Sequence, residues 1–221
     1  KLMEEQYDDL TGVMTRHSLW EKLETLINEA TKEKTTLTLV LTDLDHFKNF
    51  NDTYGHAMGD ELIVTFARAL QSNCREQDLI GRYGGEEFVV VMPDTLPEEA
   101  LLMMEDVRRQ ISTTKYQLTD NDKTIEHSFT FSGGIAAFPK DGKDSREVMR
   151  AADGALYRAK VNGRDRLALA VKTRMVLKSN YYSKTHLEKL AELAKKTQKT
   201  EAFLLREALD DLLVKYGDER M

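Results

Sequence analysis

DLIGRYGGEEFVVVMP, at residues 78–93, contains two short apolar segments on either side of a Gly-Gly-Glu-Glu segment. Gly84 and Gly85 have no Cβ, so their backbone can adopt positive φ. The pair predicts a β-hairpin that turns tightly at these two residues. Glu86 and Glu87 follow directly, and the turn would present both carboxylates at one end of the hairpin.

A second pair of carboxylates ends another predicted strand. TLTLVLTDLD, at residues 36–45, is a buried apolar strand that finishes in Asp43 and Asp45. Singly, acids at strand ends are usually ordinary solvated side chains. Beside the glutamates of the hairpin, however, they would form a site of hard oxygen ligands, which Mg²⁺ or Mn²⁺ prefers.

Up to Val171 the sequence alternates between helical and extended patterns. Apolar residues at helical spacing predict helices, and apolar runs bounded by turn residues predict further strands. The predicted helices are 17–30, 56–73, 97–111 and 144–163, and the further strands are 123–139 and 166–171. This order predicts the α/β class, with helices packed on a mixed sheet.

The character of the sequence changes after Val171. Residues 171–221 hold 11 Lys and Arg against 8 Asp and Glu, a balance of +3, whereas the rest of the chain has a balance of −9. Two helical patterns follow, the second with Thr200 as its N-cap, and each has an apolar face. The faces are Leu187, Leu190, Ala191, Leu193 and Ala194, then Phe203, Leu204, Ala208, Leu209, Leu212 and Leu213. Two short helices cannot bury both faces alone, so we expect two units, 1–171 and 172–221, the second with a partner.

Composition excludes several other classes of protein. No apolar run approaches the ~20 residues of a membrane helix, and the polar N-terminus is not a signal peptide, although a start at Lys1 leads us to expect further sequence upstream. Cys74 is the only cysteine, which excludes an internal disulfide and favours the cytoplasm as the compartment. The chain has no phosphate loop, no dinucleotide-binding glycine motif and no zinc-ligand spacing.

Five motifs, in order, resemble those of the GGDEF family of diguanylate cyclases. Y-G-G-E-E-F at 83–88 is similar to the family signature in its Glu variant. The other four are Asp9-Leu10-Thr11-Gly12, the run from Asp43 to Asp52, Gly55-His56-x-x-Gly59-Asp60, and Ala155-Leu156-Tyr157-x-Ala159-Lys160-x-x-Gly163-Arg164. The resemblance extends over residues 7–170.

This resemblance implies a fold and an activity. The fold would be a ferredoxin-like sheet with flanking helices, as in the palm of nucleotide polymerases, and the activity the condensation of two GTP into cyclic di-GMP. Two Mg²⁺ or Mn²⁺ ions would polarise the α-phosphate. The implied metal ligands are Asp43, the carbonyl of Leu44, Glu86 and Glu87. The implied phosphate contacts are the backbone of Phe47 and Lys48, the side chains of Lys48, Lys160 and Arg164, and the turn glycines Gly84 and Gly85.

Two further sites are implied by the resemblance. Asn51 and Asp60 would read guanine, because a carboxylate can accept from both N1–H and N2–H, which adenine cannot supply. Arg75 and Asp78 match an R-x-x-D site at which the product cyclic di-GMP inhibits the family, and Arg108 or Arg109 is a candidate for a further arginine there. Asp165 departs from the asparagine that is common after the final Gly-Arg, and an acid there would weaken phosphate binding slightly.

The tail, at residues 174–216, resembles a ribbon–helix–helix domain, a dimeric DNA-binding fold. The helices favour that fold, but inward positions of the strand fall on Lys178 and Asn180, where apolar residues are usual. The tail is therefore either a DNA reader or a plain homodimerisation hairpin. Two alternatives to an active cyclase follow: a non-catalytic cyclic di-GMP receptor using Arg75 and Asp78, and a nucleotide-regulated DNA-binding protein.

Overall fold

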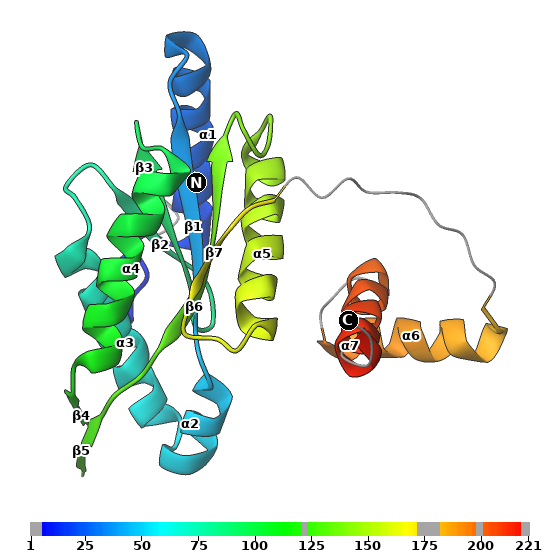
Figure 1. Cartoon of the computed structure of the whole chain (residues 1–221). Coiled ribbons are helices and arrows are strands. Elements are labelled where there is room, and N and C mark those ends of the chain that lie inside the picture. The colour runs from blue at the N-terminus through cyan, green and yellow to red at the C-terminus, as the bar shows by residue number, and fades with distance from the viewer. Residues whose placement is uncertain (1–5, 121–122, 172–181, 198–200, 218–221) are drawn as a thin grey trace, which may run out of the picture. The chain divides into compact units, whose positions relative to one another are not determined.

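A mixed five-stranded sheet organises the first part of the chain, in the order β2-β3-β1-β6-β7 (Figure 1). The strands are β1 (Leu37–Leu44), β2 (Leu79–Gly84), β3 (Glu87–Pro93), β6 (Phe131–Phe138) and β7 (Leu167–Leu169). β1 lies in the middle, antiparallel to both β3 and β6, and β7 pairs parallel with β6 at the edge. The first four strands have the order of a ferredoxin-like sheet, so the predicted α/β class with a mixed sheet is confirmed.

The structure is a computed structural model, and it describes residues 6–120, 123–171, 182–197 and 201–217. The chain divides into two units, Lys1–Thr173 and Arg174–Met221. Each unit is described by itself below. Over the described residues, none of the helices combines the length and the apolar character that crossing a bilayer would require.

Helices cover both faces of the sheet (Figure 1). α3 (His56–Asn73) and α4 (Pro97–Thr113) pack on one face, whereas α1 (Arg16–Glu33) and α5 (Ser145–Val161) pack on the other. Successive strand residues point to opposite faces, so in β1 Val40 joins the α3/α4 core and Leu41 joins the α1/α5 core. Each of the four predicted helices is therefore confirmed, with α3 at the predicted bounds.

The helix α5 lies so close to β6 that one strand residue must be glycine. A Cβ on Gly134 would collide with the backbone carbonyl of Ala152 and the backbone amide of Leu156. Ala152 and Ala155 are buried beside it. The backbone of α5 thus rests directly on the sheet, and this contact fixes the position of the helix that carries Lys160.

Two sequence-based expectations were wrong in detail. The single strand at 123–139 is two strands: β5 (Thr124–His127) pairs with β4 (Tyr116–Thr119) in a separate hairpin, and only β6 joins the main sheet. The chain bends between them, where Phe129 turns into the core against Phe66. An additional helix, α2 (Phe47–Tyr54), follows β1 directly. Its aromatic residues Phe47, Phe50 and Tyr54 share one face, but only Phe50 is buried, and eight residues are too short a segment for periodicity alone to identify a helix.

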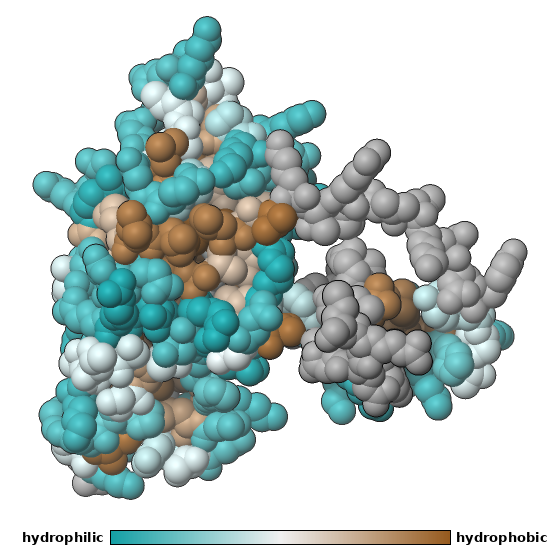
Figure 2. Space-filling model, viewed as in Figure 1, coloured by the Kyte–Doolittle hydropathy of each residue, from teal (hydrophilic) through white to brown (hydrophobic). Residues whose placement is uncertain are grey.

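The apolar surface of the first unit gathers at one edge of the sheet. Figure 2 shows this surface around β7, between α4 and α5. The three residues of β7 are half-buried, because this edge strand has a neighbour on one side only.

The second unit consists of two helices, α6 (Lys184–Thr197) and α7 (Glu201–Gly217), which contact each other. Leu204 is buried, whereas Leu187, Leu193, Leu209 and Leu212 are between 44% and 56% exposed. The two predicted helices are confirmed, with much of their apolar surface uncovered. The ribbon strand, with Lys178 and Asn180, and the N-cap at Thr200 lie outside the described residues.

Candidate active site

The end of β1 places Asp43 against the hairpin of β2 and β3. Asp43 is paired across the strands with Glu87, and side chains directly opposite in an antiparallel pair lie within contact distance. Asp43 is only 6% exposed. Its Oδ2 atom lies 2.7 Å from Nζ of Lys160, which reaches it from α5. Strand and helix therefore bring together two carboxylates and an ammonium group that are far apart in the sequence.

Burial and mutual repulsion make these carboxylates hard to ionise. The pKa of Asp43 is raised, first by burial and then by the charges of Glu86 and Asp45, while Lys160 opposes the rise. The pKa of Glu87 is raised by burial and by the charge of Asp43. A divalent cation would relieve this repulsion more fully than one lysine does, so the donor set fits Mg²⁺ or Mn²⁺.

Within the described residues, no group of three or more His, Cys, Asp or Glu side chains is arranged to hold a metal ion. The peptide of Leu44 lies beside the turn, since its N–H donates to the carbonyl of Glu86 at 3.4 Å. Two carboxylates and a carbonyl are few ligands. A Mg²⁺ site of this kind usually takes its remaining ligands from water and substrate phosphates.

The hairpin turn differs from the sequence-based prediction. β2 extends to Gly84, which pairs with Glu87, so the turn consists of Gly85 and Glu86 and not of Gly84 and Gly85. Neither glycine has a positive φ. Instead, the guanidinium group of Arg82 donates to the carbonyl of Gly85 from Nε at 3.0 Å and from Nη2 at 2.9 Å. This clamp and the bulge between Arg82 and Gly84 shape the turn.

The predicted phosphate contacts lie next to this carboxylate pair. Phe47 and Lys48 form the first turn of α2, after His46, whose φ is 59°. Free N–H groups at a helix N-terminus favour an anion. Lys48 and Arg164 are exposed, whereas Lys160 is committed to Asp43. Two exposed cations and a helix N-terminus are therefore available to a triphosphate.

The two residues predicted to read guanine come from adjacent helices. Asn51 is on α2 and Asp60 is in the first turns of α3. A Cβ on Gly59 would collide with Oδ1 of Asn51, so the side chain of Asn51 lies directly against the start of α3. Oδ1 of Asn51 is buried and has no hydrogen-bond partner. A buried acceptor without a donor is costly, and an N–H group of a bound base would satisfy it.

Asp45, the second aspartate at the end of β1, accepts hydrogen bonds from neighbouring groups of the protein. Its Oδ1 accepts from Oγ of Ser132 at 2.7 Å, and its Oδ2 accepts from Oγ1 of Thr130 at 2.8 Å and from the backbone N–H of Asp165 at 2.9 Å. Its oxygens are therefore engaged by protein donors. Asp45 joins β1 and β6 to the loop that follows α5.

Arg75 and Asp78 pair with each other at the far end of the sheet. Nη2 of Arg75 donates to Oδ1 of Asp78 at 2.7 Å, and the backbone N–H of Arg75 donates to Oδ2 at 2.9 Å. The side chain of Asp78 is 0% exposed and that of Arg75 is 36% exposed. Burial, and then the charge of Asp78, raise the pKa of the neighbouring Cys74 thiol to about 12. Asp78 thus orients Arg75, and the guanidinium group is the accessible partner.

The candidates for a further arginine at this position lie elsewhere. Arg75 also donates to Oγ1 of Thr95 at 2.7 Å, just before the start of α4. Arg108 is near the other end of α4 and donates to Asp165 at 2.7 Å. Arg109 faces Asp106 at 3.6 Å. Arg108 and Arg109 lie at least 11 residues from Pro97, the first residue of α4. This corresponds to roughly 16 Å along the helix at 1.5 Å per residue.

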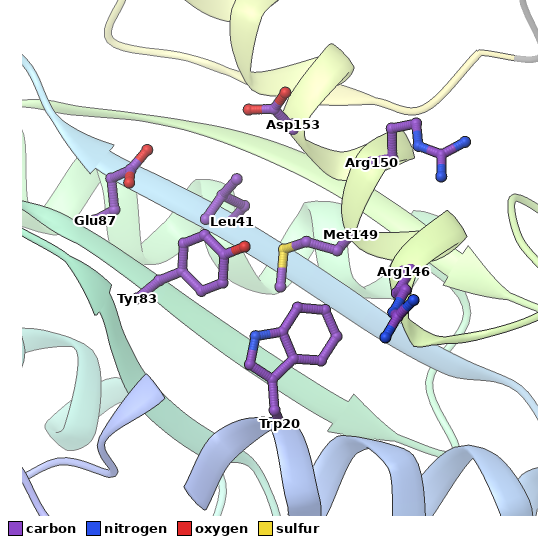
Figure 3. Close-up of a pocket in the computed structure, with 8 residues that line it drawn as sticks. All are labelled: Trp20, Leu41, Tyr83, Glu87, Arg146, Met149, Arg150 and Asp153. Carbon is purple, nitrogen blue, oxygen red and sulfur yellow. The ribbon is translucent and has the colours of Figure 1, made fainter. Parts of the chain in front are cut away.

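A cavity of about 310 Å³ opens on the α1/α5 side of the sheet (Figure 3). Glu87 and Asp153 lie toward one end of it, and Arg146 lies toward the other, near Trp20. Of the predicted site residues, only Glu87 lines this cavity. Tyr83 also lines it and belongs to the Y-G-G-E-E-F motif, whereas the other lining residues belong to none of the motifs. Helical spacing from Lys160 is the signal that could have placed Asp153 on the same face of α5.

The comparisons with known proteins agree with this arrangement. The diguanylate cyclase GGDEF-domain family matches residues 5–166. The chain is 38% identical over 158 residues to the response regulator PleD of Caulobacter vibrioides, covering 72% of this chain and 34% of PleD. It is 40% identical over 164 residues to the diguanylate cyclase DgcP of Pseudomonas aeruginosa, covering 74% of this chain and 24% of DgcP.

A solved structure shows the same fold. The GGDEF domain of DgcB from Caulobacter crescentus, in complex with c-di-GMP, is 32% identical, with a TM-score of 0.70, and the match covers 77% of this chain and 98% of that one. The family match and these relatives define the class of the domain, a nucleotidyltransferase domain. The chain belongs to the GGDEF family of diguanylate cyclases. It spans about a third or less of the length of PleD and DgcP.

Proposed function

We propose that this chain is an active diguanylate cyclase that condenses two GTP into cyclic di-GMP with Mg²⁺ or Mn²⁺. The observation that carries the proposal is the pairing of Asp43 with Glu87, beside Lys160, Glu86 and the Leu44 peptide. Buried carboxylates that repel one another are costly to keep. A metal-dependent reaction on phosphate would explain why these carboxylates are kept close together despite this cost.

In the proposed reaction the 3′-oxygen of each GTP attacks the α-phosphorus of the other. The bond between the α-phosphorus and the bridging oxygen breaks, and pyrophosphate leaves; two such steps close the ring and release two pyrophosphates. The divalent ions, held by Asp43, Glu86, Glu87 and the Leu44 carbonyl, would stabilise charge on the α-phosphate. Gly84 and Gly85, which have no side chains, would contact the substrate beside the hairpin turn.

The chain itself mainly binds and orients. Phe47 and Lys48 would receive the β- and γ-phosphates at the start of α2, and Lys48 and Arg164 would neutralise their charge. Lys160 contacts Asp43 at 2.7 Å and opposes the rise in the pKa of Asp43 that burial causes. Positioning and electrostatic stabilisation of this kind can supply most of the rate of phosphoryl-type transfers.

Guanine selectivity is expected from Asn51 and Asp60. The proposal rests on the unsatisfied Oδ1 of Asn51 and on the exposed carboxylate of Asp60 next to it. Guanine offers N1–H and N2–H to these acceptors. Adenine has no hydrogen on N1 or C2 that could donate in this way.

We expect the purified chain with GTP and Mg²⁺ to form cyclic di-GMP, and with ATP to form product at least about 100-fold more slowly, as sites built to accept a substrate N–H discriminate. Asp60→Ala should lower kcat/KM for GTP by about 10- to 100-fold and leave the low ATP rate unchanged. Chromatography of the products measures both rates, with Glu61→Ala as the control. No product from GTP would refute the cyclase assignment, and equal GTP and ATP rates would refute only the guanine-reading role.

Inhibition by the product is also part of the proposal. Arg75 is half-exposed and is held by the buried Asp78, so one guanidinium group is presented to solvent in a fixed orientation. A guanidinium group can bind a phosphate by two hydrogen bonds and can stack on guanine. Asp78 would act by orienting Arg75.

Arg75→Ala should raise the concentration of cyclic di-GMP that gives half-inhibition by about 10- to 100-fold, the usual loss for a charged hydrogen-bonding partner. Initial rates at increasing cyclic di-GMP, each normalised to the variant's own uninhibited rate, measure the shift. Arg109→Ala, which removes an exposed arginine of α4, is the matched control. An unchanged half-inhibition in Arg75→Ala would leave the pair with Asp78 as a structural ion pair only.

A homodimer completes the proposal. Each active site would hold one GTP, so two sites must face each other to close the ring, and the uncovered leucines of α6 and α7 offer a surface for pairing.

A receptor that only binds cyclic di-GMP would have no use for the acids at the end of β1.

A further inference from the structure

Arg108, on α4, is tied to the loop that carries a predicted phosphate-binding residue. Nη1 of Arg108 donates to Oδ1 of Asp165 at 2.7 Å. Its Nη2 and Nε atoms donate to Oε2 of Glu105 at 2.9 and 3.0 Å, so α4 itself holds the guanidinium group in place. The side chain of Arg108 is 16% exposed. This is a fixed, largely buried cation next to the site, and no step of the proposed reaction uses it.

The loop that Arg108 contacts has an unfavourable backbone conformation. Arg164 has a φ of 60° and Asp165 a φ of 45°, directly after Gly163 at 107°. Left-handed conformations are unfavourable for non-glycine residues, so surrounding contacts must stabilise them. The contacts are N–H of Arg164 to the carbonyl of Ala159 at 3.0 Å and N–H of Asp165 to Oδ2 of Asp45 at 2.9 Å. Arg108 supplies the contact to the side chain of Asp165.

The charge of Asp165 is the second part of the argument. It directly follows Arg164, one turn beyond Lys160, so it brings a carboxylate to the place where the triphosphate is expected. The side chain of Asp165 is 41% exposed. Without a partner its charge would repel the substrate. Arg108 is the ion-pair partner that the described residues provide.

We propose that Arg108 is a positioning residue of the substrate site: through Asp165 it holds the loop that carries Arg164 and cancels the negative charge that this loop brings toward the triphosphate. The inference rests on the proposed function, because it assumes that GTP phosphates contact Arg164. The inference also predicts how the residue at position 165 depends on the residue at position 108. An aspartate at this position requires a cation at position 108, whereas an asparagine would not.

The test measures the Kd of a non-hydrolysable GTP analogue with Mg²⁺ by calorimetry, so it does not depend on turnover. Arg108→Ala should weaken binding by about 5- to 20-fold, since it leaves a carboxylate unpaired beside the phosphates. Asp165→Asn should stay within about threefold of the wild type, because asparagine tolerates the left-handed conformation and carries no charge. The double variant should bind as Asp165→Asn does, which would show that Arg108 acts through Asp165.

Controls separate the possible failures. Arg109→Ala, one residue along α4, should bind as the wild type does. A wild-type chain that binds no GTP analogue would refute the proposed function. Normal binding by the wild type and by Arg108→Ala would refute this inference alone, as would a double variant no tighter than Arg108→Ala. A fall in Tm for Arg108→Ala with unchanged Kd would assign the ion pair to stability only.

Discussion

Asp43→Asn is expected to lower the rate of cyclic di-GMP formation by about 10³-fold or more. The substitution preserves shape but removes a charged ligand of the proposed metal ions, and several kcal/mol of charge stabilisation in the transition state correspond to such a factor. The folded protein should not lose stability. Asp43 is 6% exposed and burial raises its pKa, so a neutral side chain removes a desolvation cost.

Two measurements check this result. Thermal unfolding should give a Tm for Asp43→Asn equal to or above that of the wild type. Mg²⁺ added with a GTP analogue should raise the Tm of the wild type by more than the analogue alone does, and this metal-dependent increase should vanish in the variant. Asp106→Asn, at an exposed position on α4, is the matched control. Wild-type turnover in a folded Asp43→Asn protein would remove Asp43 from the reaction.

Removing residues 172–221 is expected to make activity depend steeply on protein concentration. Two GTP-loaded sites must meet, and a dimeric tail would raise their effective concentration into the millimolar range. At about 1 μM protein the truncated chain should therefore be on the order of 10²- to 10³-fold less active per chain. The remaining part should fold, because the solved GGDEF domain of DgcB corresponds to the first unit of this chain.

Sedimentation of both chains alongside activity decides this prediction. A finer test keeps the chain at full length: Leu209→Glu with Leu212→Glu places two charges on the exposed leucines of α7 and should also give monomers. Glu192→Ala, at an exposed polar position of α6, should remain a dimer. If the full chain is a monomer, or the truncated chain dimerises and works equally well, the tail does not serve catalysis.

The sequence predicted those parts of the structure that periodicity and local chemistry determine. The helix at 56–73 has a continuous apolar face, and the structure gives it the same bounds. The acidic end of β1 could be predicted because the apolar run at residues 36–45 finishes in Asp43 and Asp45. The pairing of Asp43 with Glu87 depends on register between segments far apart in the sequence, so only the family resemblance implied it.

The errors have physical causes that can be named. The hairpin was expected to need positive φ at its glycines, but Arg82 shapes the turn through the carbonyl of Gly85. The expectation that Asp165 weakens phosphate binding stays a prediction, and the sequence did not show its ion-pair partner Arg108, which lies 57 residues away. A single sequence shows which residues are charged. It does not show which charges are neutralised by contacts across the fold.

The contact of α5 with β6 has a consequence for how this domain can change over evolutionary time. The proposed active site needs the ammonium group of Lys160 within contact distance of Asp43. The backbone of α5 rests directly on β6 at Gly134, which leaves no room for a methyl group, and this close packing sets the position of Lys160. Even alanine there would lift the helix, and the ammonium group would leave the carboxylate. In the proposed cyclase, the contact between Lys160 and Asp43 therefore depends on a residue without a side chain in the middle of β6.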